Sequence, residues 1–221
     1  MLVKEILNTD ISPLKLTDTV ATALMKIELL HTNKFCVVNE DGKVIGMASL
    51  EKLIEVVNES SVLSEVELDE PLTVPKGQHL FEASRVMLAK ELYLIPVVDS
   101  EMIFQGMIKK RDLLAALGEA FNLSSFGSVI AVEMNQPDFT LADLVRIIEM
   151  EGAKILGVAV QQPSADNPSY RVSFKLNLED SSTISSSLRR FGYTIISEAN
   201  SEALENNFSD RADELIRYLD I

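Results

Sequence analysis

The chain has 221 residues, 47% of them hydrophobic, which is enough for two or three small domains with buried cores, and its single cysteine excludes an intramolecular disulfide. The formal net charge of −14 leaves no extended basic surface, so nucleic acid is not an expected partner. No stretch approaches the roughly 18 apolar residues of a membrane helix, and the charged N-terminus has no apolar signal core. We therefore expect a cytoplasmic protein with no membrane partner.

The first half of the chain contains an internal repeat. Residues 35–39 (FCVVN) recur 60 positions later as residues 95–99 (IPVVD), and Gly46 recurs at the same offset as Gly106. A shared offset over strands and turns indicates two copies of one structural unit.

Each copy predicts the element order β-α-β-β-α. A short extended segment (14–16 or 72–74) precedes a run with apolar residues at helical spacing, for which Asp18 is the predicted N-cap in the first copy. Two short strands follow, joined in the first copy by the turn Asp41-Gly42, and a second helix closes the unit. Because one such unit has a small core and exposed sheet edges, we expect the copies to pair and leave a crevice for a small ligand.

A different pattern begins near Gly127. Residues 128–134, 155–160, 170–178 and 193–196 predict strands, with helices after Thr140 and over 181–191. The resulting order β-α-β-β-α-β is that of a ferredoxin-like fold. The tail, from Asn207 to Ile221, has apolar residues at helical spacing and predicts a C-terminal helix that docks on the body or on a partner chain.

On these motifs, the first half of the chain resembles a tandem pair of CBS domains, known as a Bateman module, and the second half resembles an ACT domain. This order is similar to that of the acetoin-utilisation regulatory proteins of bacteria. We therefore expect an α+β protein with CBS units at residues 1–60 and 61–124, an ACT-like domain at 127–199 and a helical tail at 200–221.

The resemblance implies adenosine ligands, held by a Ser or Thr hydroxyl and by an Asp three residues later at the start of the closing helix. In the family the Asp accepts hydrogen bonds from the ribose hydroxyls, as an ionised carboxylate can. The first unit has Ser49, but Lys52 stands in place of the Asp. The second unit has Asp112, but Lys109 stands in place of the hydroxyl. Each unit therefore keeps half of the pattern.

The second unit also carries the densest basic run of the chain, Lys109-Lys110-Arg111, directly before Asp112. The run is interpreted either as a phosphate-facing patch or as a solvated helix start with a surface salt bridge. The expected regulatory ligand, bound rather than used as a cofactor, is AMP, ADP, ATP or S-adenosylmethionine. Three further positions that match the lining of the family's pocket, but that also suit a core or a turn, are Thr17, Ile95 and Pro96.

ACT domains commonly bind amino acids at the turn between the first strand and the first helix, often across a dimer interface. By resemblance that site would use Asn135, Gln136 and Asp138. Asp138 stands where a glycine is usual, and its side chain would crowd and repel a ligand carboxylate. The alternative is that this domain serves as a platform for dimerisation or for docking a partner.

No catalytic or metal-binding motif is present in the sequence. The two histidines, His31 and His79, lie at different places in the two repeats, and neither they nor Cys36 have metal-ligand spacing. We therefore predict a non-catalytic sensor that binds a small-molecule effector, forms a homodimer and acts on a regulated protein partner. The alternative hypothesis is a constitutive assembly module with degenerate ligand sites.

Overall fold

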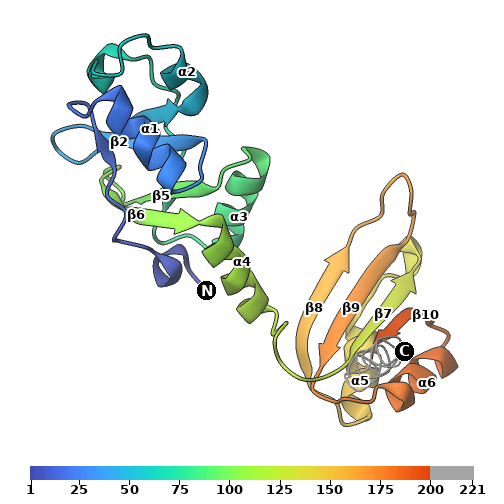
Figure 1. The fold of residues 1–221 in the computed structure, drawn as a ribbon. Helices are drawn as coiled ribbons and strands as arrows, with labels where there is room; N and C mark the ends of the chain where they lie inside the picture. Colours follow the sequence, from blue (N-terminus) through green and yellow to red (C-terminus); the bar gives the residue numbers. More distant parts are fainter. Residues whose placement is uncertain (200–221) are drawn as a thin grey trace, which may run out of the picture. The chain divides into compact units, whose positions relative to one another are not determined.

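The computed structural model describes residues 1–199, and the predicted C-terminal helix lies outside these residues. The chain forms two compact units that divide between Leu117 and Gly118. Within the described residues, no helix combines the length and the apolar character needed to cross a membrane. Figure 1 shows both units, with labels on many of their helices and strands, and each unit is described by itself below.

The first unit contains two copies of the predicted β-α-β-β-α arrangement, which confirms the repeat. Each copy has a three-stranded sheet, in which a parallel pair of strands is followed by an antiparallel pair. The first copy consists of β1 (Leu14–Lys15), α1 (Val20–Leu29), β2 (Lys34–Val38), β3 (Val44–Ser49) and α2 (Leu50–Ile54). The second copy consists of β4 (Val74–Pro75), α3 (Leu80–Ala89), β5 (Leu94–Val98), β6 (Phe104–Lys109) and α4 (Lys110–Ala120).

The first helices of the two copies begin at side-chain caps. Thr19, and not the predicted Asp18, is the N-cap of α1, because its hydroxyl accepts a hydrogen bond from Thr22 N at 3.2 Å. Asp18 instead accepts a hydrogen bond from Lys15 N at 2.9 Å and so closes the turn before the helix. At the equivalent place in the second copy, His79 Nδ1 accepts from Phe81 N at 3.3 Å and caps α3.

The cores of the two copies are joined. Phe35 and Met47 of the first copy are fully buried in one hydrophobic cluster that also contains Leu94, Val98 and Met107 of the second copy. A second cluster, around Leu80, Ile95 and Ile108, lies under α3. Because part of the core is shared, neither copy buries its apolar residues alone.

Each copy is completed by the segment that precedes the other copy. The 3-10 helix η1 (Val3–Ile6) begins where Val3 N donates to Gln78 O at 2.9 Å, ahead of α3 in the second copy. The 3-10 helix η2 (Leu63–Glu65) begins where Leu63 N donates to Asp18 O at 2.9 Å, ahead of α1 in the first copy. Val3 and Leu63 are fully buried in the cores of those copies. The two segments are therefore exchanged between the repeats.

The second unit has the predicted ferredoxin-like fold. Its elements are β7 (Val129–Met134), η3 (Gln136–Asp138), α5 (Leu141–Met150), β8 (Ile155–Gln161), β9 (Tyr170–Leu176), α6 (Ser182–Arg190) and β10 (Thr194–Ala199). The antiparallel sheet has the strand order β10-β7-β9-β8, and α5 and α6 cover one face through the cluster of Ile130, Phe174, Leu144 and Leu188.

Candidate functional site

The sheet register places the predicted ligand positions of the two repeats at equivalent points. In the first repeat Lys34 pairs with Ser49 across β2 and β3, and in the second Leu94 pairs with Lys109 across β5 and β6. The closing helices α2 and α4 begin immediately after Ser49 and Lys109. The difference between the repeats therefore lies in the side chains at these points and not in the backbone.

In the first repeat, the lysine that replaces the ribose-binding Asp is engaged by two carboxylates. Lys52 Nζ lies 3.0 Å from Asp69 Oδ1 and 2.6 Å from Glu67 Oε1. The other oxygen of Asp69, Oδ2, accepts a hydrogen bond from Lys34 Nζ at 2.5 Å. We call Lys34, Lys52, Asp69 and Glu67 the repeat-one ion cluster. One carboxylate, that of Asp69, thus bridges two ammonium groups.

The carboxylate of Asp69 is held in its charged form. Its hydrogen bond to Lys34 is the main reason that its pKa lies below the ordinary value, and Lys52 adds to this effect, while burial works against it. Its main chain is fixed as well, because Asp69 N donates to Met47 O at 2.8 Å and Met47 N donates to Asp69 O at 3.0 Å. The linker between the repeats therefore holds Asp69 at a defined position beside Met47 of β3.

Ser49 lies beside this cluster, directly before α2. The residue is buried, with 5% of its surface exposed, and it is the cross-strand neighbour of Lys34. Its hydroxyl does not cap α2.

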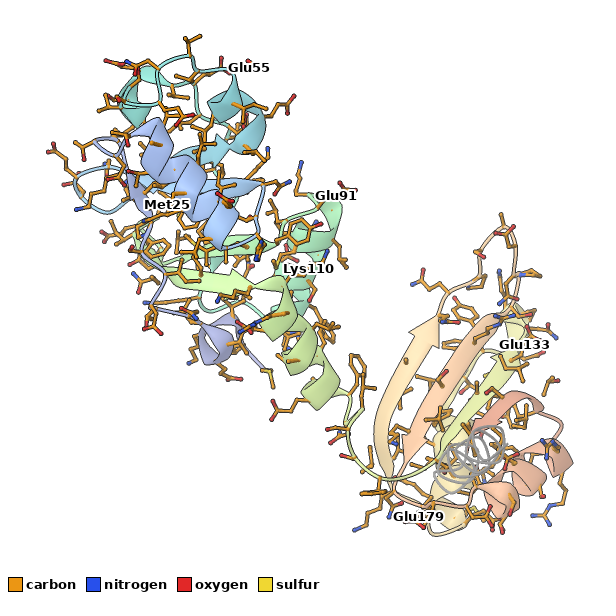
Figure 2. The ribbon with its side chains drawn as sticks, viewed as in Figure 1. Met25, Glu55, Glu91, Lys110, Glu133 and Glu179 are labelled. Carbon is orange, nitrogen blue, oxygen red and sulfur yellow. The ribbon has the colours of Figure 1, made fainter. Side chains whose placement is uncertain are left out.

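In the second repeat, the predicted basic run lines a cavity of about 320 Å³. Lys109, Lys110 and Arg111 share this cavity with Tyr93 and with residues 29–31 at the end of α1. Figure 2 labels Lys110 at the first turn of α4, and its Nζ lies 5.2 Å from the centroid of the Tyr93 ring. The cavity therefore lies between the two repeats, as predicted for a ligand crevice.

Asp112 follows the basic run but does not line this cavity. Arg111 Nε lies 3.2 Å from its Oδ1, and 35% of the Asp112 side chain is exposed. Unlike Lys52, its counterpart in the first repeat, it makes no ion pair with the linker between the repeats, within the residues that the structure describes. The carboxylate keeps free acceptor capacity for a ligand.

The remaining predicted residues of the CBS pair lie apart from that cavity. Ile95 and Pro96 are buried in β5, where they pair with Ile108 and Met107 of β6. Thr17 is exposed and lines a separate cavity of about 320 Å³ beside residues 38–40. Their participation in a ligand site stays a prediction.

The predicted ACT effector site corresponds to a cavity of about 370 Å³ in the second unit. Asn135 and Asp138 line it, whereas Gln136 does not line it and donates through Nε2 to Pro168 O at 3.4 Å. The cavity also contains three carboxylates in all, from Asp138 together with two further side chains, and two aromatic rings; these other lining residues are Glu133, Asp143, Phe191 and Tyr193. Three carboxylates disfavour a ligand that presents its own carboxylate.

Among residues 1–199, no group of three or more His, Cys, Asp or Glu side chains is placed to hold a metal ion. Sequence reasoning missed the contributions of Lys34, Glu67 and Asp69. The signal was present as acidic residues in the linker and a lysine where Lys52 stands. Their meeting depends on the pairing of the linker with β3, which no periodicity reveals.

Comparison with known proteins identifies the family. The family model described as "CBS domain" matches residues 3–59 and 63–119. A CBS domain pair/ACT domain protein from Thermotoga maritima is 29% identical, with 54% of this chain and 98% of that chain covered and a TM-score of 0.49. A putative acetoin utilization protein from Vibrio cholerae is 20% identical, with 56% and 95% covered and a TM-score of 0.47.

A third solved structure, that of CBSX2 in complex with AMP, is 18% identical, with 53% of this chain and 96% of that chain covered and a TM-score of 0.45. The two stretches that match the family model together make up more than half of the 221 residues, and they coincide with the two repeats. The chain therefore belongs to the CBS domain family.

Proposed function

We propose that this chain is a regulatory sensor whose CBS pair binds an adenosine nucleotide at the second repeat. Domains of this family are generally regulatory and not catalytic. The observation that carries the proposal is the contrast between two equivalent positions. Lys52 is paired with two linker carboxylates, whereas the similarly exposed Asp112 offers a carboxylate directly after the basic run that lines the cavity.

The chemistry of the second repeat suits a ligand that has both hydroxyl and phosphate groups. Asp112 offers two acceptor oxygens to a pair of ribose hydroxyls. Lys109, Lys110 and Arg111 line the neighbouring cavity and offer positive charge to phosphate. The cavity volume of about 320 Å³ lies in the range of roughly 300–1,000 Å³ that is typical of small-molecule sites.

The charged groups that line the cavity also predict the order of affinity for the expected ligands. Because three cationic side chains line the cavity, we expect affinity to rise from AMP to ADP to ATP. S-adenosylmethionine carries a sulfonium and no phosphate, so it should bind more weakly than the nucleotides. The first repeat offers no carboxylate at Lys52, so we expect one nucleotide per chain.

Isothermal titration calorimetry with the four ligands tests the proposal. Asp112→Asn keeps the shape of the side chain but removes its charge, and it should weaken ATP binding by about tenfold or more, since hydrogen bonds to charged groups contribute roughly 1.5–3 kcal/mol. Glu51→Gln, the same change of charge at an exposed position of α2, is the matched control and should leave binding unchanged. If no adenosine compound binds the wild-type chain, the assembly-module hypothesis replaces the sensor.

The proposal extends to how a bound nucleotide would act. Because part of the core is common to both repeats, a ligand in the cavity between them contacts a unit that responds as a whole. We propose that the ACT-like domain passes this response to a regulated protein partner and that the chain acts as a homodimer. Light scattering after size-exclusion chromatography, with and without ATP, measures the oligomeric state in both conditions.

A further inference from the structure

We infer that the first repeat contains an anion site that the protein itself fills: the carboxylate of Asp69 lies between Lys34 and Lys52, and removal of its charge opens this site to a phosphate group. The inference goes beyond the proposed function and does not depend on it, because none of these residues belongs to the second repeat's cavity. It assigns to Asp69 the role of excluding external anions from one of two equivalent sites.

The first step of the argument is the geometry of the two ammonium groups. Lys34 Nζ and Lys52 Nζ contact different oxygens of the same carboxylate, at 2.5 and 3.0 Å. Two cations that converge on a pair of acceptor oxygens form the arrangement that also receives two oxygens of a phosphate. The side chains of Lys34 and Lys52 are about 30% exposed, so an external anion could reach them once the carboxylate is neutral.

The second step is the hydroxyl of Ser49. It belongs to the cross-strand neighbour of Lys34 and does not cap α2. A hydroxyl donates readily to a phosphate oxygen, so Ser49 adds a possible donor beside the two lysines. Two ammonium groups and a neighbouring hydroxyl together suit an anion larger than the carboxylate that now lies between the lysines.

The third step is the origin of Asp69. The residue comes from the linker, and its main chain pairs with Met47 through two hydrogen bonds of 2.8 and 3.0 Å. The backbone pairing, and not the contact with the two lysines, therefore determines where the carboxylate lies. Asp69→Asn should therefore leave the linker in place and remove the negative charge between the lysines, and Asp69→Ala should also vacate the position.

The position of Lys52 also predicts what the opened site recognises. Lys52 has donors and no acceptor, so it offers nothing to ribose hydroxyls. The opened site should therefore bind the phosphate part of a ligand without regard to the nucleoside. Inorganic triphosphate and ATP both carry a triphosphate group. Comparison of the two probes therefore distinguishes recognition of phosphate alone from recognition of a nucleotide.

The experiment uses a full-length background in which Lys109, Lys110 and Arg111 are all replaced by glutamine, so that the second repeat's basic run does not contribute. Titration calorimetry with inorganic triphosphate is then compared between this background and the same protein with Asp69→Asn. Binding should tighten by about tenfold or more in the Asp69→Asn protein, because the substitution removes a negative charge that repels the triphosphate from the two lysines. Further substitution of Lys52→Gln should abolish the gain.

Glu65→Gln is the matched control, since it removes one carboxylate from the same linker at an exposed position that makes no ion pair within the described residues. An equal gain in this control would show a general charge effect and would overturn the inference. Binding of ATP more than about tenfold tighter than inorganic triphosphate, a difference of about 1.4 kcal/mol, would contradict phosphate-only recognition.

Asp69→Ala is the second variant, and circular dichroism verifies that both variants remain folded. No gain of triphosphate binding in either folded variant would overturn the inference and would leave the proposed nucleotide site of the second repeat unaffected. Conversely, loss of the proposed function in the Asp112→Asn titration would leave this experiment valid, because the two sites use different residues.

Discussion

A Cβ atom on Gly106 would lie 2.7 Å from the carbonyl oxygen of Asn8. That carbonyl accepts a hydrogen bond from Met107 N at 2.8 Å, so the N-terminal segment is held directly against β6. Gly46 has the same relationship to the linker, because its added Cβ would lie 2.9 Å from the carbonyl oxygen of Asp69. The two glycines recur because each repeat receives an exchanged segment at this point of its sheet.

Gly106→Ala should destabilise the CBS unit. Gly106 has φ +149°, a conformation that L side chains rarely adopt, and the added methyl would contact the backbone of Asn8, which has no room to rotate away. We expect a loss of about 2–4 kcal/mol in the free energy of unfolding, from backbone strain and overpacking together. Urea unfolding followed by circular dichroism measures this change.

Gly77→Ala is the matched control for that prediction, because no atom lies within 4 Å of its added Cβ. Its effect should stay within about 0.5 kcal/mol, as for most surface substitutions. Equal stability of the Gly106→Ala and wild-type proteins would show that the N-terminal segment does not rest on β6 in solution.

The elements of the CBS pair were predictable because they depend on local patterns. The repeated strands around Val37 and Val97 bury their valines, and the Asp41-Gly42 turn connects β2 to β3, where Gly42 has φ +78°. The exchange of segments was not predictable, because it pairs Asn8 with Met107 across 99 positions of the chain. Local capping was only partly predictable, since Asp18 and Thr19 are both good cap residues and the turn uses one of them.

The candidate site likewise divides into residues that the repeat predicts and contacts that depend on the fold. The sequence located Ser49, Lys52, Lys109 and Asp112, because they occupy matching places in the repeat. It did not reveal that Lys52 is neutralised by the linker, because an ion pair between residues 52 and 69 has no sequence period. The sequence of strand residue Ile95 suits a pocket and a core position equally well, and its full burial in β5 leaves its part in a ligand site a prediction.

The repeat-one ion cluster should make stability depend on pH in the acid range. The hydrogen bond from Lys34, assisted by Lys52, lowers the pKa of Asp69 in the folded state below its ordinary value of 3.8. The stabilising contribution is therefore fully present above the unfolded pKa and is lost as the pH falls through the lowered folded pKa. Asp69→Asn removes this contribution, so the stability gap between wild type and variant should shrink as the pH falls from about 5 to about 2.

Urea midpoints of both proteins across that pH range measure the gap. Glu65→Gln serves again as the control and should leave the pH profile parallel to that of wild type. The cluster is partly exposed, so about 1 M NaCl should also narrow the gap between wild type and Asp69→Asn at pH 7. A gap that widens on acidification would mean that the carboxylate does not bind the lysines in its charged form.

Cys36 should report unfolding of the CBS unit through its reactivity. The thiol is fully buried in β2, and burial raises its pKa from 9.0 to about 12, against the opposing effects of its own backbone hydrogen bond and of Lys26. At pH 8 about one thiol in ten thousand is then ionised, and the thiolate is the nucleophile in disulfide exchange. Reaction with Ellman's reagent should be very slow in native buffer and complete in denaturant, with one thiol per chain.

The dependence of that reaction on urea separates two ways of reaching the thiol. If Cys36 is exposed only when the shared core opens, its reaction rate should rise in step with the loss of helical signal, because β2 contributes to the cluster that contains Leu94 and Met107. Leu63→Ala weakens this core, because Leu63 of the exchanged segment packs in the same cluster. The substitution should therefore raise the reaction rate of Cys36 further. Rapid labelling without loss of helical signal would instead mean that β2 opens locally, and it would contradict a core that the two repeats share as one cooperative unit.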